Sequence, residues 1–223
     1  MIITVDGPVA SGKTTIGKML AGRLNFDYLY SGYLYRAIAY VLCEKGIYAV
    51  ENFSTLSMEL LKKILEEMRI EYYFIPGGNC SICINKQSIE ESLLMTPLMD
   101  RAASMLGLNN NVRMLLTDIQ RNLVIGRNVI VDGRDAGAIV FPRAEYKFFL
   151  TASIQVRIKR YIERQEKIGK HCTQLEAERI IMERDQRDGR WLTKPNTIHG
   201  VITIDTSFMN KEEAVETIIS HFL

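Results

Sequence analysis

The chain has 223 residues, of which 47% are hydrophobic and 24% charged, and its formal net charge is +2. This composition provides a core for one medium-sized domain and excludes an intrinsically disordered chain. The small net charge does not indicate a nucleic-acid-binding protein, and no apolar stretch reaches the roughly 18 residues that span a bilayer. We expect no signal peptide, because the first apolar run leads into a glycine loop by residue 7.

Apolar spacing predicts strands and helices in alternation through the first part of the chain. The predicted order is strand 1–5, helix 14–25, strand 26–30, helix 31–46 and amphipathic helix 55–68. Residues 69–89, "RIEYYFIPGGNCSICINKQSI", then alternate, turn at "PGGN" and alternate again. This pattern predicts a β-hairpin, which would be a small antiparallel insertion between helices.

The second part of the chain returns to alternating strands and helices. It predicts helix 112–124, strand 128–135, strand 145–152, helices 153–169 and 174–191, strand 200–207 and helix 210–223. Such alternation at both ends predicts an α/β fold with a mostly parallel central sheet covered on both faces.

Four cysteines in a chain of this length indicate a reducing compartment, and we therefore expect a cytoplasmic protein. Cys80 and Cys83 have the spacing of a redox or zinc motif. Strand alternation, however, places Cys80 with Ile82 and Ile84 on one face and Cys83 on the other. Because no second cysteine pair is available for zinc, we interpret both as ordinary strand residues.

Residues 7–15, "GPVASGKTT", match the phosphate-loop pattern G-x-x-x-x-G-K-[ST] between a predicted strand and a predicted helix. Glycines allow positive φ, so that successive N–H groups turn toward phosphate oxygens at the positive end of the helix dipole. Lys13 should reach the β- and γ-phosphates, and the Thr14 hydroxyl should ligate Mg²⁺. The predicted ATP-binding residues here are Gly7, Pro8, Val9, Ala10, Ser11, Gly12, Lys13, Thr14 and Thr15. The alternative is a plain glycine-rich turn.

A phosphate loop alone does not distinguish kinases from switches and motors. A small-molecule kinase needs a second anion site, because its acceptor is often itself a phosphate. Planar arginines suit such a site, since they bind phosphate bidentately and neutralise the charge of the transferred group. Candidates are Arg36, Arg134, Arg157, Arg160, Arg184 and Arg190. The plainer interpretation is a set of solvated helix faces, and we retain it for Arg164, Arg179 and Arg187.

The segments "VDGPVASGKTT", "SGYLYR", "VDGRDAGAIVFPRAEYKFFLTAS" and "ERDQRDGR" followed by "IDTS" occur in this order. They resemble the bacterial cytidylate kinases from residue 2 to about residue 207. The resemblance implies one three-layer P-loop NTPase domain over 1–223, with an acceptor-nucleotide-binding insertion at about 37–105 and a helical lid at 154–192. It further implies ATP-dependent phosphorylation of CMP and dCMP, with Mg²⁺ accompanying ATP.

The resemblance also implies roles for residues of the acceptor site. Ser31 and Arg36 would lie in the acceptor pocket, with Arg36 on the α-phosphate. Arg113 and Asp135 would contact the cytosine edge, whose N4 donor lies beside the N3 and O2 acceptors. The ribose would be bound by Ser104, Arg184 and Asp188.

Further implied roles concern phosphoryl transfer. Arg134 would face the acceptor phosphate, and Arg157 and Arg160 would lie on a lid that closes over the triphosphate. The implied catalytic residues are Lys13, Arg36, Arg134 and Arg157. Asp6, Asp132 and Asp135 are all candidates for the carboxylates around Mg²⁺.

Three positions depart from the pattern of that family. Tyr30 stands where an aspartate is usual, Thr14 where a glycine often follows the lysine, and Trp191 where an arginine is usual. We assign Arg190 to the last role, because a one-residue deletion before "IDTS" would bring it into register.

Two alternative functions remain open at this point. One is a P-loop kinase for another nucleoside monophosphate or a small metabolite; the other is a nucleotide-binding regulatory module without an acceptor. For the leading hypothesis the partners are ATP and CMP or dCMP, with no nucleic acid and no membrane, and we expect a monomer.

Overall fold

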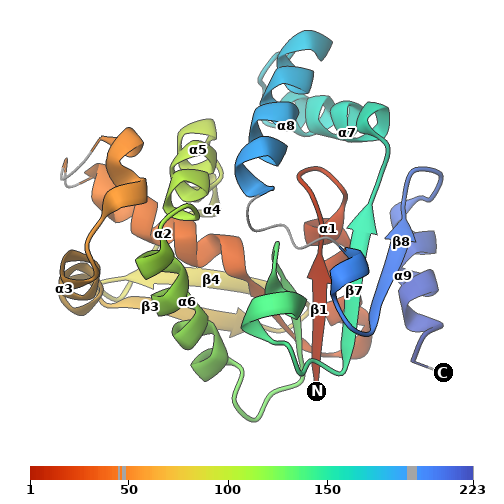
Figure 1. The fold of residues 1–223 in the computed structure, drawn as a ribbon, viewed down its shortest axis with the longest axis horizontal. Coiled ribbons are helices and arrows are strands. Elements are labelled where there is room, and N and C mark those ends of the chain that lie inside the picture. Colours follow the sequence, from red (N-terminus) through yellow and green to blue (C-terminus); the bar gives the residue numbers. More distant parts are fainter. Residues whose placement is uncertain (45, 47–48, 190–194, 223) are drawn as a thin grey trace.

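The computed structural model describes residues 1–44, 46, 49–189 and 195–222 (Figure 1). Within them, the central sheet is formed by β1 (Ile2–Asp6), β2 (Asp27–Tyr30), β6 (Val129–Asp132), β7 (Tyr146–Thr151) and β8 (Val201–Asp205). All neighbouring pairs are parallel, and the strand order is β2-β6-β1-β7-β8. The predicted parallel sheet is confirmed, and β1, which precedes the glycine loop, is its central strand.

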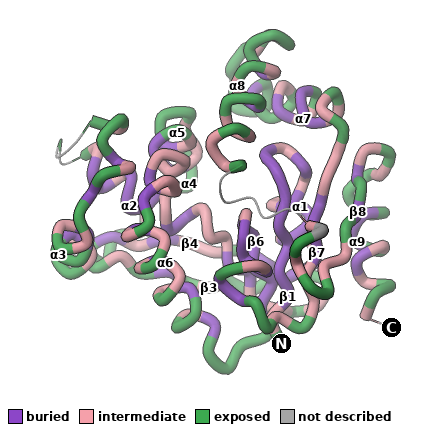
Figure 2. The backbone as a smooth tube through the Cα atoms, in the orientation of Figure 1, coloured by how far each residue is buried: buried purple, intermediate pink, exposed green. Residues whose placement is uncertain are grey.

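Helices cover both faces of this sheet. On one face α1 (Lys13–Leu24) and α9 (Lys211–Ile219) pack in a core cluster with Ile3, Val5 and Ile130. On the other face α2 (Ser31–Glu44) and α6 (Asn110–Leu123) share a cluster with Val129 and Val131. Consecutive residues of β6 therefore point into opposite clusters, as a buried strand requires. Helices on both faces of the sheet confirm the predicted three-layer fold. Figure 2 shows β1 and β6 as mainly buried chain.

A separate antiparallel sheet consists of β3 (Ile70–Ile75), β4 (Asn79–Ile84) and β5 (Gln87–Ser88). β3 and β4 form the predicted hairpin around "PGGN". On β4, Ile82 and Ile84 are buried and Cys80 packs against both core clusters, as expected for one face of a strand. All four cysteines lie in the described part of the chain and are free.

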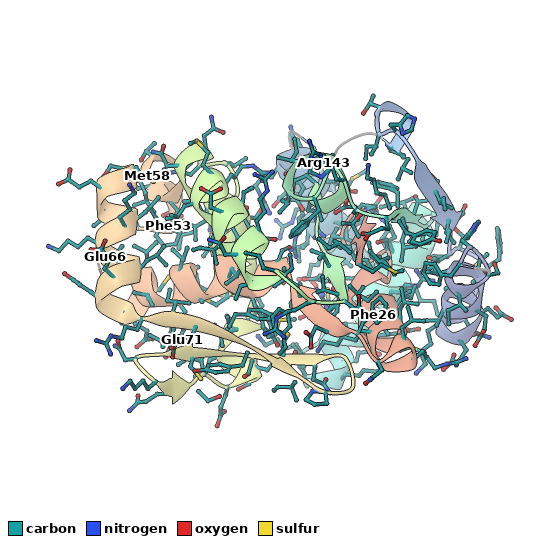
Figure 3. All side chains as sticks on the ribbon, turned by 90° about the horizontal axis from the view of Figure 1, so that it is seen from below. Phe26, Phe53, Met58, Glu66, Glu71 and Arg143 are labelled. Atoms are coloured by element: carbon teal, nitrogen blue, oxygen red, sulfur yellow. The ribbon has the colours of Figure 1, made fainter. Side chains whose placement is uncertain are left out.

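Helical segments surround the hairpin on both sides in the sequence. Before it come the 3₁₀ helix Val50–Thr55 and α3 (Met58–Met68); after it come α4 (Glu91–Leu94) and α5 (Pro97–Leu106). Phe53 is fully buried in this part, whereas Glu66 projects outward from α3 (Figure 3). The sequence analysis missed α5, although Thr96 caps it by accepting a hydrogen bond from Met99 N (3.2 Å) and Pro97 occupies its first turn.

The remaining elements lie near the carboxyl ends of the central strands. Helices α7 (Ile154–Lys167) and α8 (Gln174–Asp188) pack against each other beyond the carboxyl ends of β1 and β7 (Figure 1). Their small core includes Val9 of the glycine loop, so this helix pair rests directly on the loop. A π-helical turn, Ala136–Val140, follows β6, and a 3₁₀ turn, Pro195–Thr197, precedes β8. Among the described residues, no helix combines the length and apolar character of a membrane span.

The hairpin turn is packed tightly against α1, and this contact can be tested. Gly77 and Gly78 both have positive φ (81° and 77°), but a Cβ on Gly78 would lie 2.2 Å from the carbonyl oxygen of Lys18. At Gly77 the nearest atom would be 3.8 Å away. We expect Gly78→Ala to lower the free energy of unfolding by about 2 kcal/mol more than Gly77→Ala, because both strain the backbone and only the first adds a clash. Urea denaturation of the two variants measures this difference, and equal losses would contradict the packing.

Candidate active site

The glycine loop between β1 and α1 has the backbone conformation that its motif predicts. Gly7 and Gly12 have φ of 152° and 96°, and Ala10 also adopts a positive φ of 58°. Helix α1 begins at Lys13 directly after the loop. The buried Lys13 side chain curls over the loop and donates from Nζ to the carbonyl oxygen of Pro8 (3.1 Å).

Lys13 is buried beside both cationic and anionic side chains. Burial lowers the pKa of Lys13 well below its usual value, and Arg134 and Arg184 lower it further against the opposing effect of Asp132 and Asp188. A bound polyanion would favour the charged lysine, since it would replace the lost water and screen the neighbouring cation. The electrostatics of the loop are therefore those of an anion-binding site.

The oxygen atoms beside the loop fit a magnesium ion accompanying a nucleotide. Thr14 Oγ1 donates to Asp132 Oδ2 (2.5 Å), which also accepts from the Tyr28 hydroxyl (3.0 Å). The other oxygen, Asp132 Oδ1, is buried without a hydrogen-bond partner in the described structure. Mg²⁺ prefers oxygen ligands and retains several waters, so a hydroxyl with one nearby carboxylate suits it. Within the described ranges, no group of three or more His, Cys, Asp or Glu residues could hold a metal.

The two other candidate carboxylates for magnesium have different partners. Asp6 accepts hydrogen bonds from the backbone N–H groups of Ala136 (2.9 Å) and Gly137 (2.8 Å), and burial raises its pKa to about 7. Asp135 pairs with Arg113. Of the three, Asp132 is the carboxylate that contacts Thr14.

Arg113 on α6 and Asp135 after β6 form a direct ion pair, although they are far apart in the sequence. Both side chains are mostly buried. Burial raises the pKa of Asp135 against the opposing effect of Arg113. The pair therefore provides a guanidinium as hydrogen-bond donor and a carboxylate as hydrogen-bond acceptor, both largely removed from water.

Asp188 at the end of α8 contacts several residues that were predicted to bind the acceptor nucleotide. Its carboxylate accepts from Arg134 Nε (2.9 Å) and from Ser104 Oγ (3.3 Å), and it lies 3.8 Å from Arg184 Nε. Arg187, which the sequence analysis treated as solvated, donates from Nε to Ser104 Oγ (3.2 Å). Helix α8 is thus joined to α5 and to the segment after β6.

Arg36 on α2 is buried, with 3% of its surface exposed. It donates to the carbonyl oxygen of Leu94 (3.1 Å) and to the hydroxyl of Tyr30 (3.5 Å), and it forms an ion pair with Asp100. The unusual Tyr30 therefore contacts the guanidinium directly. Ser31, the next residue, donates to the carbonyl oxygen of Asp132 (2.6 Å).

The two predicted lid arginines on α7 differ in position. Arg160 donates to the carbonyl oxygens of Ser11 (3.2 Å) and Thr206 (2.7 Å), so it lies across the glycine loop. Arg157 is buried in an ion pair with Asp185 and does not line the cavity described below. Its contact with the triphosphate stays a prediction, and it would require the guanidinium to leave Asp185. Arg190 and Trp191 lie outside the described residues.

One cavity of about 570 Å³ extends from the glycine loop to the arginine cluster, which consists of Arg36, Arg113, Arg134 and Arg184. Lys13 and Thr14 line it together with six predicted acceptor residues, Ser31, Arg36, Ser104, Arg113, Arg134 and Asp135. Arg184 and Asp188 of α8 also line it.

The sequence analysis missed some of the lining, notably Arg164, Arg187, Thr206 and Lys211. The position of "IDTS" at the carboxyl end of a parallel strand was the available signal for Thr206.

A phosphate loop after the central strand of a parallel sheet, facing arginines and carboxylates across one cavity, defines a P-loop kinase. The family model described as cytidylate kinase matches residues 3–222. The chain belongs to the cytidylate kinase family.

Individual relatives agree with this assignment. A cytidylate kinase of Thermotoga maritima is 36% identical over 218 residues, which cover 97% of this chain and 94% of that protein. One of Clostridium botulinum is 34% identical over 217 residues, with the same coverage of each chain. Among solved structures, an uncharacterized protein from Eubacterium ventriosum aligns with a TM-score of 0.53 and 12% identity over 99% of this chain and 97% of that chain, a likeness of fold alone.

The charges around Asp100 predict a dependence of stability on pH. Burial alone would raise the pKa of this carboxyl, but Arg184, Arg36 and Arg164 together outweigh burial and lower the pKa from 3.8 to about 2. Because the folded pKa is the lower one, the stabilisation is present above pH 4 and is lost as the pH falls from about 4 to about 2. It amounts to about 2 kcal/mol.

We therefore expect the wild-type protein to lose free energy of unfolding more steeply than Asp100→Asn between about pH 5 and pH 2, with the gap between them closing. Denaturant titrations at several pH values measure both curves. Parallel curves would show that Asp100 is not held ionised by these arginines.

Proposed function

We propose that this protein transfers the γ-phosphoryl group of ATP to CMP or dCMP, producing ADP and CDP or dCDP. The observation that carries the proposal is the single cavity shared by the glycine loop and the arginine cluster. Such a cavity can hold a triphosphate and a monophosphate facing each other. Membership of the cytidylate kinase family supports the choice of acceptor.

The Arg113–Asp135 pair supports cytosine as the acceptor base. Cytosine presents the N4 amino donor beside the N3 and O2 acceptors, so a carboxylate and a guanidinium complement its edge. Uracil has an acceptor at the corresponding position, and Asp135 would face it unfavourably. Ser104, Arg184 and Asp188, which lie together, would contact the sugar.

The transfer needs no protein nucleophile. An oxygen of the CMP phosphate attacks the γ-phosphorus, its bond to phosphorus forms while the bond to the bridging β-oxygen breaks, and ADP leaves. Lys13, Arg36 and Arg134 would neutralise charge on the transferred group and hold the two phosphates in line. Arg160, already over the loop, would help to exclude water from the site.

Magnesium would enter with ATP, and it would supply further charge neutralisation at the β- and γ-phosphates. Thr14 and Asp132 are the residues that would hold it, directly or through water. We also retain Arg157 as a proposed lid residue, one that would have to exchange Asp185 for a phosphate when nucleotide binds.

The substrate proposal is tested by the production of ADP with a panel of acceptors. We expect the kcat/KM with CMP or dCMP to exceed that with AMP or GMP by about 10²-fold or more, because the buried pair is left unsatisfied by the wrong base. A coupled assay with CMP, dCMP, UMP, AMP, GMP and shikimate measures this ratio. Preference for shikimate would contradict the nucleotide assignment, and absence of CMP-dependent ADP production at any concentration would favour the regulatory module.

A substitution at Asp135 tests how the base is recognised. We expect Asp135→Asn to lower kcat/KM for CMP by about tenfold to hundredfold, since it removes a charged hydrogen bond and leaves Arg113 without its carboxylate. ATP affinity should stay within about twofold of wild type, because the glycine loop is unaltered. Steady-state kinetics and ATP titration measure both, with Asp118→Asn, an exposed residue on α6, as the control. An equal loss of ATP affinity would indicate general disruption of the cleft.

A further inference from the structure

Three arginines from three helices converge on Asp100 of α5. Arg36 of α2 forms a direct ion pair with it, Arg184 of α8 lies 3.5 Å from its Oδ1, and Arg164 of α7 lies 3.8 Å from its Oδ2. Helix α5 is in contact with both α2 and α8, so its position allows this convergence (Figure 1). One carboxylate therefore joins the helix pair α7–α8 to the core helix α2.

The arginines and the carboxylate occupy different sides of the cavity wall. Arg36, Arg164 and Arg184 all line the cavity, whereas Asp100 does not. Asp100 thus contacts the guanidinium groups without itself lining the cavity. Asp188 also lies 3.8 Å from Arg184 and is shared with Arg134, so four arginines face two carboxylates here. The net charge of these six groups is about +2, which matches the dianion of a phosphate monoester.

Two donor atoms of this cluster have no hydrogen-bond partner. Arg36 Nε and Arg184 Nε are buried, and neither makes a hydrogen bond within the described part of the chain, although Arg184 Nε lies 3.8 Å from Asp188 Oδ2. Arg36 is 3% exposed, so water does not readily satisfy it. A buried donor without a partner is costly, and an anion in the adjoining cavity would remove this cost.

We propose that Asp100 is a positioning residue for the acceptor phosphate: it fixes Arg36 and draws Arg164 and Arg184 of the two lid helices toward the same point. The inference rests on the proposed function, because it takes the phosphate of a nucleoside monophosphate as the ligand. Binding of that phosphate then favours the closed position of α7 and α8 over the glycine loop. Arg164, which the sequence pattern assigns to a solvated face, has a specific place in this arrangement.

The decisive variant is Asp100→Asn, measured with CMP and with cytidine. Without the carboxylate the three guanidinium groups repel one another and the lid arginines move away, so we expect the KM for CMP to rise about tenfold. Inhibition by cytidine, which lacks the phosphate, should weaken much less than the binding of CMP, because cytidine depends only on the sugar contact of Arg184. Asp100→Glu should restore most of the affinity for CMP. Glu51→Gln, which removes the exposed partner of the neighbouring Arg101, is the matched control and should behave as wild type.

Other results would overturn the proposal. A lower KM for CMP would mean that Asp100 competes with the phosphate, and equal losses with CMP and cytidine would mean that it only stabilises the fold. If Asp100→Asn does not fold, Arg164→Gln serves instead, because Arg164 is 43% exposed and its replacement should leave the fold intact. We expect this variant to raise the KM for CMP about threefold, and an unchanged KM would overturn the proposal.

The same assay separates the two hypotheses. Wild-type protein without CMP-dependent ADP production would refute the proposed function, and this inference with it. Normal wild-type kinetics with an unaltered Asp100→Asn would refute the role of Asp100 alone.

Discussion

The structure depends on the pairing of buried arginines with carboxylates around one cavity. A guanidinium removed from water is costly unless a partner compensates for the lost hydration. Here the compensation comes from Asp135 for Arg113, Asp188 for Arg134 and Asp100 for Arg36. In each pair the two residues come from separate segments, so the pairs also fix how those segments meet. The positive charge that remains unpaired is what two phosphate-bearing ligands would neutralise.

The parallel sheet explains why the site forms where it does. The carboxyl ends of β1, β6 and β8 lie at one edge, and from there the chain continues into the glycine loop, the Arg134–Asp135 segment and the loop containing Thr206. Strand β1 packs Ile3 and Val5 into one core cluster and Ile2 against the other, so the glycine loop is anchored at this edge. Residues of α2, α5 and α6 line one side of the cavity, and residues of α7 and α8 line it above the glycine loop.

The contacts of Tyr30 and Arg157 determine which charged side chains face the cavity. The ring of Tyr30 lies 4.8 Å from that of Tyr33, and its hydroxyl accepts a hydrogen bond from Arg36. An uncharged hydroxyl at this point leaves the balance of charge around Arg36 to Asp100. Arg157, by contrast, is held by Asp185 away from the cavity. On α7, Arg160 therefore lies at the glycine loop and Arg164 lies at Asp100.

Local sequence determined the parts of this protein that depend on neighbouring residues. The glycine loop at 7–15 depends on the backbone freedom of its glycines and on the helix that follows it. The "PGGN" turn specifies the hairpin, and strand alternation places Cys80 on the face of Ile82 and Ile84. The resemblance to a known family implied that Arg113 and Asp135 lie together, but only the tertiary structure brought Arg36, Arg164 and Arg184 to Asp100. Ser104, Arg187 and Asp188 come together only because α8 packs near α5, and Asp100 has no motif of its own. The physical reason is that the free energy of a buried charge depends on neighbours distant in sequence, whereas turns and periodic elements depend on adjacent residues.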